Sequence, residues 1–300
     1  MFMQILEPIR EFLELPEVTD VLISGSRKTL VERAGQLQEV SNVFESEEEL
    51  RNWAVLVIRS GGGRIDISKP ISEVSLNTDW GLLRFHCVLG GECSIGTQIS
   101  IRRHSIKHFQ LSDLVAANFL SDEQLVILKQ ILIEKSNFVI VGGTGTGKTT
   151  LLRALMNDCS AERIITIEDS PELELSGNAV ALKTRMANHE EVGAITSSAL
   201  LREALRMRPD RMVIGEVRGE ELLVLLQALN TGHSGSGFTL HANSIAEVVP
   251  RMLAILAGVG MQPSLAKVLI SASIHWAIDV KRLSAGRELV AIERLVIKLE

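Results

Sequence analysis

The sequence predicts an α/β protein in two parts, an N-terminal mixed α/β domain over residues 1–104 and a C-terminal α/β domain with a mainly parallel sheet over residues 121–300. In the first part, short strands and turn glycines surround a helix with marked ends. In the second part, short apolar strands alternate with helical segments, which is typical of a parallel sheet covered by helices on both faces. Residues 105–120, polar and then weakly helical, are expected to link the two domains.

The N-terminal domain is expected to begin with a short amphipathic helix near residues 3–14. A small antiparallel sheet follows, with turns at Gly25 and Gly35. The spacing of Ser46 and Glu49 is that of a capping box and predicts the start of a longer helix. Two further strands are expected around residues 81–89 and 97–103.

A second capping box, formed by Ser121 and Gln124, marks the start of the C-terminal domain. Short apolar segments with the length of buried strands follow, separated by helical segments such as SSALLREALRMR and EELLVLLQALN. After Ile278 the sequence predicts a closing antiparallel pair of strands that turns at Gly286. The strands of the alternating region are predicted at NFVIVG, RIITIE, AVALKT, RMVIG and GFTLH.

Composition excludes several classes of protein. The chain has 46% apolar residues, as a folded globular protein does, and a net charge of −6, which gives it no overall attraction for nucleic acid. No uninterrupted apolar stretch approaches the roughly 20 residues of a membrane-spanning helix, and the acidic start does not resemble a signal peptide. Cys87, Cys93 and Cys159 form no C-x-x-C pair and are expected to be reduced thiols. We therefore expect a cytoplasmic protein that neither binds nucleic acid nor inserts into a membrane.

The segment NFVIVGGTGTGKTT contains the strongest motif of the chain, because it fits G-x-x-x-x-G-K-[ST] between a predicted strand and a predicted helix. Glycines allow consecutive backbone N–H groups to converge on phosphate oxygens. Lys148 is expected to reach the β and γ phosphates, and the Thr149 hydroxyl to ligate Mg²⁺. The motif predicts ATP and Mg²⁺ as cofactors. The predicted nucleotide-binding residues of this loop are Gly142, Gly143, Thr144, Gly145, Thr146, Gly147, Lys148, Thr149 and Thr150.

Acidic residues follow two of the predicted strands. RIITIEDS ends in Glu168 and Asp169, and RMVIGEVRG has Glu216 next to Gly215, where a Walker B strand usually has an aspartate. We expect Glu216 to polarise the attacking water and Glu168 to share the metal-ligand role, directly or through a water. Asp169 and Arg218 are expected to support the site.

The segment TGHSGSGFTLHAN places His233 and His241 in a run of glycine, serine and threonine. GHSGS nearly spells the G-x-S-x-G elbow of a serine hydrolase, but Ser236 stands at the last glycine position and no Asp–His partner is recognisable. A metal site would need a third ligand nearby. The remaining interpretation is that the histidines stand beside a phosphate.

Four blocks occur together in a fixed order: residues 142–150, IITIEDSPELEL at 164–175, VIGEVRGEE at 213–221 and GHSGSGFTLHANS at 232–244. In this combination they resemble the Walker A loop, aspartate box, Walker B strand and histidine box of the secretion ATPase superfamily, which powers type II and type IV secretion and type IV pili. The resemblance covers nearly all of the C-terminal domain. It implies a RecA-like domain that couples ATP hydrolysis to mechanical work.

The resemblance also implies roles for residues outside the loop. His241 is expected near the γ-phosphate, and His233 is expected to shape the glycine loop. In the N-terminal strands, Arg84 and Arg102 match arginines that face the phosphates, with Arg103 as a further candidate. The resemblance further implies a homohexamer, with the N-terminal domain of one subunit against the C-terminal domain of its neighbour, and an inner-membrane platform protein as partner.

Within the superfamily, TLVERAGQLQEV, LREALRMRPDRMVIGEVRG and LLQALNTGHSGS are most similar to the Tad/Flp pilus assembly ATPases of the CpaF type. Three scattered cysteines cannot supply the zinc-binding tetracysteine element of many pilus-extension relatives. The expected function is a hexameric cytoplasmic ATPase, peripheral to the inner membrane, that powers Tad/Flp pilus assembly or protein secretion. A conjugation ATPase of the VirB or Trb type is the alternative.

Two functions of other classes stay open. A RecA-like nucleic-acid motor would need a basic or aromatic track, and the chain has no tyrosine and three tryptophans. A nucleotide-dependent scaffold would need only the phosphate loop, whereas this chain also has Glu168, Glu216 and His241.

Overall fold

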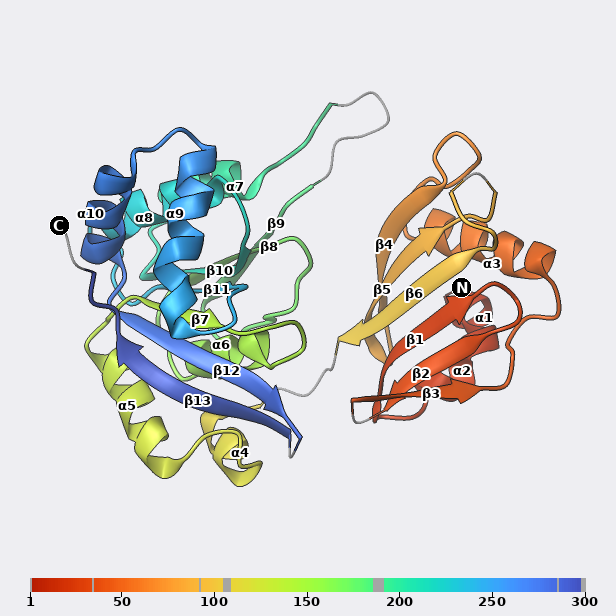
Figure 1. The fold of residues 1–300 in the computed structure, drawn as a ribbon, viewed down its shortest axis with the longest axis horizontal. Coiled ribbons are helices and arrows are strands. Elements are labelled where there is room, and N and C mark those ends of the chain that lie inside the picture. Colours follow the sequence, from red (N-terminus) through yellow and green to blue (C-terminus); the bar gives the residue numbers. More distant parts are fainter. Residues whose placement is uncertain are drawn as a thin grey trace. The chain divides into compact units, whose positions relative to one another are not determined.

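A computed structural model describes residues 2–33, 35–91, 93–104, 109–185, 192–284 and 286–297. The chain forms two compact units, Met1–Lys107 and His108–Glu300. Figure 1 shows their helices and strands. In the described part of the chain, no helix has both the length and the apolar character needed to cross a membrane.

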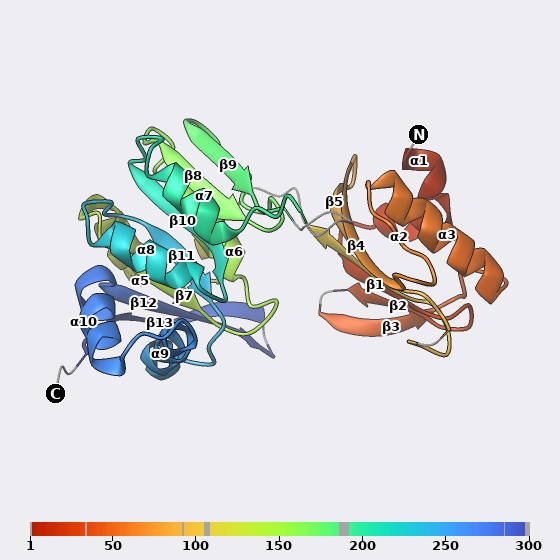
Figure 2. The ribbon, with the colours of Figure 1, turned by 90° about the horizontal axis from the view of Figure 1, so that it is seen from above.

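In its described residues, the first unit has a six-stranded antiparallel sheet with helices on one face (Figure 2). The strand order is β3-β2-β1-β6-β5-β4. Phe85, Ile101 and Leu83 of the sheet are buried together with Trp53 and Val57 of the longest helix, so this face holds the core. The strands are β1 (Val18–Ser24), β2 (Thr29–Arg33), β3 (Gln36–Val40), β4 (Ile71–Thr78), β5 (Gly81–Val88) and β6 (Gln98–His104), and the helices are α1 (Phe2–Ile5), the 3₁₀ helix η1 (Glu7–Ile9), α2 (Arg10–Leu13) and α3 (Glu47–Ser60).

The predicted start of α3 is confirmed, with one difference in its cap. The Ser46 hydroxyl accepts a hydrogen bond from the Glu49 N–H, as a capping box requires. The Glu49 carboxylate, however, accepts from the N–H of Glu45 at 2.8 Å, one residue earlier than the motif predicts. Strand β4 was not expected, although its burial alternates along the strand as an edge strand with one buried face does.

The second unit has a seven-stranded sheet in the described residues, in the order β13-β12-β7-β11-β10-β8-β9. All neighbouring pairs are parallel except β12 with β13. This confirms the predicted α/β fold with a mainly parallel sheet. The strands are β7 (Phe138–Val141), β8 (Ile164–Glu168), β9 (Ala179–Lys183), β10 (Arg211–Val217), β11 (Gly237–Leu240), β12 (Trp276–Leu283) and β13 (Gly286–Arg294), and the helices are α4 (Leu111–Ala116), α5 (Asp122–Ile133), α6 (Lys148–Asn157), α7 (Ser197–Ala204), α8 (Glu221–Leu229), the 3₁₀ helix η2 (Ile245–Glu247), α9 (Val248–Gly258) and α10 (Pro263–Ser273).

Two apolar layers cover the faces of this sheet. One combines the sheet with residues of α7, α8, α9 and α10, and the other combines it with residues of α4, α5 and α6. The central strands β7, β8 and β11 consist of buried residues throughout, which explains why their sequences are apolar without alternation. Because β7, β11, β10 and β8 are neighbours, the segments that follow them meet at one edge of the sheet.

The expected linker differs from the structure. Residues 105–108 lie outside the described residues, and residues 109–120 fold as part of the second unit. Leu111, Leu114, Phe119 and Leu120 are buried in its core, because the weakly helical segment forms α4 and packs beside α5 and α6.

Candidate nucleotide site

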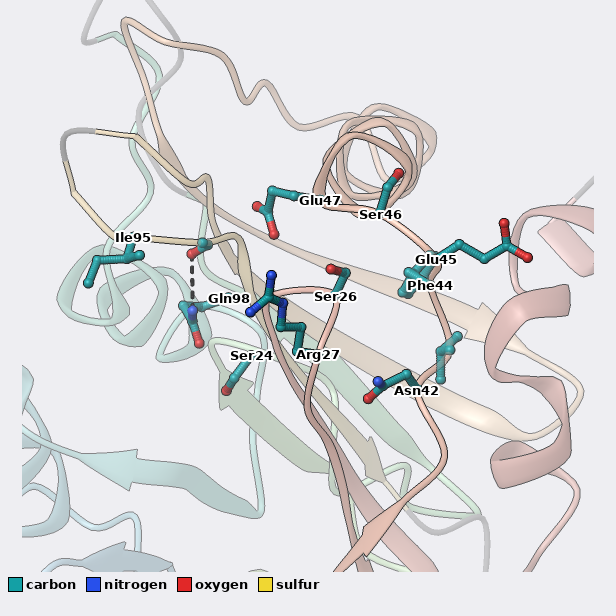
Figure 3. A pocket seen from close by; sticks show the side chains of 13 residues that line it. Ser24, Ser26, Arg27, Asn42, Phe44, Glu45, Ser46, Glu47, Ile95 and Gln98 are labelled. Atoms are coloured by element: carbon teal, nitrogen blue, oxygen red, sulfur yellow. Dashed lines mark hydrogen bonds between the residues drawn. The ribbon is translucent and has the colours of Figure 1, made fainter.

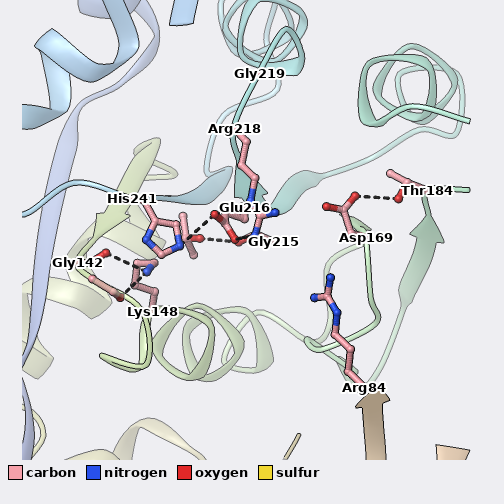
Figure 4. Close-up of polar contacts among 12 residues, drawn as sticks. Arg84, Gly142, Lys148, Asp169, Thr184, Gly215, Glu216, Arg218, Gly219 and His241 are labelled. Atoms are coloured by element: carbon pink, nitrogen blue, oxygen red, sulfur yellow. Dashed lines mark hydrogen bonds and ion pairs between the residues drawn. The ribbon is translucent and has the colours of Figure 1, made fainter. Parts of the chain in front are cut away.

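The glycine-rich loop joins β7 to α6, as its motif predicts. Gly147 caps the helix in the left-handed conformation with φ of 100°, which a glycine adopts without strain. The Lys148 ammonium donates to the carbonyls of Gly142 at 2.9 Å and Gly143 at 2.7 Å (Figure 4). Thr149 and Thr150 lie in the first turn of α6, and the helix N-terminus directs its partial positive charge to the loop.

Glu168 is the last residue of β8, and its side chain is buried with 6% of the residue exposed. Its Oε1 accepts hydrogen bonds from the N–H groups of Glu172 and Leu173, both at 3.0 Å. Burial raises the pKa of Glu168 to about 7, because the two hydrogen bonds from the backbone only partly offset the loss of solvation. A carboxylate and the Thr149 hydroxyl are oxygen ligands of the kind that Mg²⁺ prefers, so the residues present fit that metal.

Gly215 lies against Glu168. A Cβ on Gly215 would stand 3.0 Å from Cγ and 3.4 Å from Oε1 of Glu168. The Glu168 side chain therefore fills the space into which an aspartate at position 215 would point. This contact gives a physical reason for the missing Walker B aspartate.

Glu216, on β10, is held by two partners (Figure 4). Arg218 donates to both carboxylate oxygens, from Nε at 2.7 Å and from Nη2 at 2.6 Å. His241 directly follows β11, and its Nε2 lies 3.0 Å from Glu216 Oε1. Burial alone would raise the pKa of Glu216, but Arg218, His241 and Lys148 outweigh it and lower that pKa. Burial, followed by the charge of Lys148, lowers the pKa of His241.

Asp169 is turned toward the neighbouring strand, where its carboxylate accepts a hydrogen bond from the Thr184 hydroxyl at 2.8 Å. Its charge also helps to raise the pKa of Arg218, after the larger effect of the hydrogen bond with Glu216. Lys148, Glu216, His241 and Arg218 thus form one polar cluster, and Asp169 stands at its border.

His241 directly follows β11 and His233 stands four residues before it, and the strand between them is about 13 Å long at the usual rise per residue. His233 Nδ1 is 3.2 Å from the Ala228 carbonyl, and the His233 carbonyl accepts from the Ser236 hydroxyl at 3.1 Å. One metal ion cannot bridge them, and the described residues contain no group of three potential metal ligands. The serine-hydrolase interpretation is wrong as well, because an elbow needs a strand before and a helix after, whereas α8 precedes this segment and β11 follows it.

In the first unit, Arg84 on β5 and Arg102 on β6 are direct cross-strand partners, so their side chains leave the same face of the sheet. Arg84 forms an ion pair with Glu73 at 2.7 Å. Arg103 points elsewhere, since it donates to the carbonyls of Trp80, Leu13 and Leu15. Of the candidate arginines, Arg84 and Arg102 therefore form the pair.

The first unit also contains a hollow of about 1080 Å³ between the β1–β2 turn, the start of α3 and the segment before β6 (Figure 3). Arg27, Glu45 and Glu47 line it together with Phe44 and Ile95. The Glu47 carboxylate accepts a hydrogen bond from the Thr97 N–H. Glu47 thus holds the segment before β6 in place, and none of the residues predicted to bind nucleotide lines this hollow.

Two contacts to the glycine-rich loop involve residues that no motif marks. Arg287 Nε donates to the Gly145 carbonyl at 2.7 Å, and a Cβ on Gly147 would stand 2.9 Å from the Phe119 ring. Both residues are distant from the loop in sequence, so no local spacing could have revealed them.

The chain is similar to known proteins of one family. Residues 91–290 match the family model described as Type II/IV secretion system protein. A protein of Mycobacterium tuberculosis named for conjugal transfer is 36% identical over 293 residues, covering 96% of this chain and 82% of that protein. The crystal structure of the VirB11 ATPase of the Brucella suis type IV secretion system is 25% identical, with a TM-score of 0.52 and coverage of 97% and 96%. The Legionella pneumophila ATPase DotB shares the fold, with 22% identity, a TM-score of 0.68 and coverage of 97% and 80%.

The fold and the loop define a RecA-like nucleotide-binding protein with an additional N-terminal domain. The match to the family model covers residues 91–290, which include β6 of the first unit and nearly all of the second unit, and the chain belongs to the type II/IV secretion ATPase family.

Proposed function

We propose that this chain hydrolyses ATP in a Mg²⁺-dependent reaction and couples hydrolysis to mechanical work. One observation supports the proposal above all others. Lys148, Glu216 and His241 come from three separate motifs and lie together at the carboxyl edge of the sheet, with Glu168 one strand away. ATP binding alone would need only the loop.

In this proposal the loop amides, Lys148 and Thr149 bind the phosphates, and Glu216 orients the attacking water. Thr149, and Glu168 directly or through a water, would hold Mg²⁺, which would supply positive charge to the bound phosphates. Because its pKa is lowered, Glu216 is ionised at neutral pH and can accept a hydrogen bond from water. Arg218 donates one hydrogen bond to each carboxylate oxygen of Glu216, and each oxygen has a second lone pair, so Glu216 can accept from the water while Arg218 keeps it in place.

Two variants test the chemistry. Lys148→Ala is expected to lose ATP binding, because it removes the ammonium that the loop places at the phosphates. Glu216→Gln is expected to bind ATP as the wild type does and to turn over at least about a hundredfold more slowly, since only the water-orienting group is lost. Arg206→Ala, which removes an exposed ion pair with Glu203 just after the end of α7, serves as the control. Wild-type turnover by Glu216→Gln would show that another residue orients the water.

For assembly, we propose a homohexamer bound to an inner-membrane platform protein at the cytoplasmic face. Arg84 and Arg102 are proposed to face the phosphates of the nucleotide, since their shared face offers two guanidinium groups. Mass measurement in solution with and without a non-hydrolysable ATP analogue tests the ring. A protein that stays monomeric at high concentration in both conditions would contradict it.

We further propose that the motor serves Tad/Flp pilus assembly or protein secretion, on the similarity of three of its segments to the CpaF-type ATPases. One finding favours the second candidate, a conjugation motor: the 36% identical relative is named for conjugal transfer. Deletion of the gene separates the two, because loss of pili with normal DNA transfer supports the first and the reverse result supports the second. Stimulation of the ATPase by nucleic acid would instead indicate a nucleic-acid motor.

A further inference from the structure

The hairpin of β12 and β13 lies beside the glycine-rich loop, although Arg287 and Gly145 are 142 residues apart in the sequence. Arg287 Nε donates to the Gly145 carbonyl at 2.7 Å. Arg282 Nη1 lies 3.9 Å from the position that a Cβ on Gly145 would take. Two guanidinium groups of the same unit therefore stand at the loop.

These two arginines are direct cross-strand partners in the hairpin. Like charges directly opposite each other on neighbouring strands destabilise a hairpin. The next pair, Lys281 with Glu288, has opposite charges and shows the more favourable arrangement. An arginine pair at this position is favourable only where electronegative groups face it, and the loop carbonyl is one such group.

The contact with the Gly145 carbonyl also sets the direction of a peptide group. In a trans peptide the C=O and the N–H point to opposite sides. The carbonyl of Gly145 and the N–H of Thr146 belong to the same peptide, so a carbonyl held toward Arg287 turns that N–H away from the hairpin. The N–H groups of this loop are the donors that its motif directs at phosphate.

The hairpin is anchored firmly enough to act as a support. The Leu289 N–H donates to the Phe119 carbonyl at 2.7 Å, and Gln124 Nε2 donates to the Leu289 carbonyl at 2.9 Å. Leu289 is fully buried. The strand β13 is thus fixed to the start of α5 at Leu289, two residues after Arg287.

We infer that the β12–β13 hairpin forms an outer wall of the phosphate site, in which Arg287 positions the loop through the Gly145 carbonyl and the Arg282/Arg287 pair attracts the polyphosphate of the nucleotide. The inference rests on the proposed ATP binding and adds a recognition element from the same unit. Arg287 is a positioning residue, since it acts through the loop.

The experiment measures binding of a fluorescent ATP analogue to the full chain. Arg287→Gln is expected to weaken binding about tenfold, as the loss of one charge-assisted hydrogen bond does. Arg287→Lys keeps the charge and is expected to recover part of the affinity. Arg294→Ala is the matched control, because Arg294 lies on the same strand but stacks on Trp276, 4.9 Å from its ring centre.

Two further readouts separate this role from a structural one. The thermal midpoint without nucleotide is expected to be equal in the wild type and Arg287→Gln, whereas the rise in midpoint on adding ATP is smaller in the variant. In the Arg282→Gln/Arg287→Gln double variant, the association rate is expected to depend less on salt than in the wild type.

Binding by Arg287→Gln within twofold of the wild type would overturn the inference, as would a loss of affinity matched by a lower midpoint without nucleotide. Both results leave the proposed function intact as long as Lys148→Ala fails to bind. If the wild type itself does not bind ATP, the proposed function fails instead, and with it this inference.

Discussion

Restoring the usual Walker B aspartate is expected to harm this protein. In Gly215→Asp, the new Cβ lies 3.0 Å from Glu168 Cγ, and a second carboxylate enters the volume beside a buried one. Overpacking of this kind costs about 1–3 kcal/mol. Two ionised carboxylates about 4 Å apart repel each other by about 4 kcal/mol at an effective dielectric constant of 20. Protonation of Glu168, whose pKa is about 7, relieves part of that repulsion.

We therefore expect Gly215→Asp to lose about 3 kcal/mol of the free energy of unfolding, and Gly215→Ala to lose about 1 kcal/mol from the steric contact alone. Urea unfolding followed by circular dichroism measures both. Gly258→Ala, in α9, is the control and is expected to lose no stability, because a Cβ at Gly258 would meet no atom within 4 Å.

A rescue variant sharpens the test. Glu168→Ala in the Gly215→Asp background removes the clash and is expected to restore stability and part of the Mg²⁺-dependent turnover. If Gly215→Asp alone were as stable as the wild type and hydrolysed ATP with the same Mg²⁺ dependence, Glu168 would not occupy the place of the aspartate.

Three other predictions concern single residues. The pKa of Glu168 is raised in the folded state, so the native protein keeps a proton that the unfolded chain releases. In EDTA, the free energy of unfolding measured by urea titration should therefore fall by about 3 kcal/mol as the pH rises from about 4.5 to 7. Glu168→Gln should remove this dependence on pH. Arg211 is 2% exposed and donates hydrogen bonds to two backbone carbonyls and a glutamate. Arg211→Met should lower the free energy of unfolding by about 3 kcal/mol, whereas Arg206→Ala, at an exposed position, should not change it measurably. Equal urea midpoints for the two variants would refute this. His241→Ala should lower turnover with an unchanged thermal midpoint, whereas His233→Ala should lower the midpoint, and the opposite pattern would reverse their roles.

Much of the second unit could be predicted because its central strands are buried on both faces. β7, β8 and β11 contain buried residues only, so each appears in the sequence as a short apolar segment between polar ones. The glycine-rich loop needs a strand before it and a helix after it, and both were recognisable. The sheet order then places Glu216 and His241 together, although no spacing in the sequence gives their 3.0 Å contact.

What the sequence could not reveal depends on contacts between distant segments. Phe119 lies in a segment whose sequence predicts a linker. Only its packing in the core with Leu151 and Leu289 shows that it belongs to the second unit. Arg287 reads as a solvent-exposed arginine of a terminal hairpin. Its partner is a backbone carbonyl, and backbone partners leave no pattern of residue types.

The glycines of the loop show why a motif can be recognised correctly and explained only in part. The motif accounts for glycine by the approach of phosphate oxygens. In this structure a Cβ on Gly142 would collide with the Val280 carbonyl, and a Cβ on Gly147 would collide with the Phe119 ring. Neither neighbour is a phosphate. Backbone at Val280 cannot move aside as a flexible side chain can, so a side chain at position 142 would displace the hairpin that holds Gly145. The outer face of the loop therefore constrains these two glycines independently of the nucleotide.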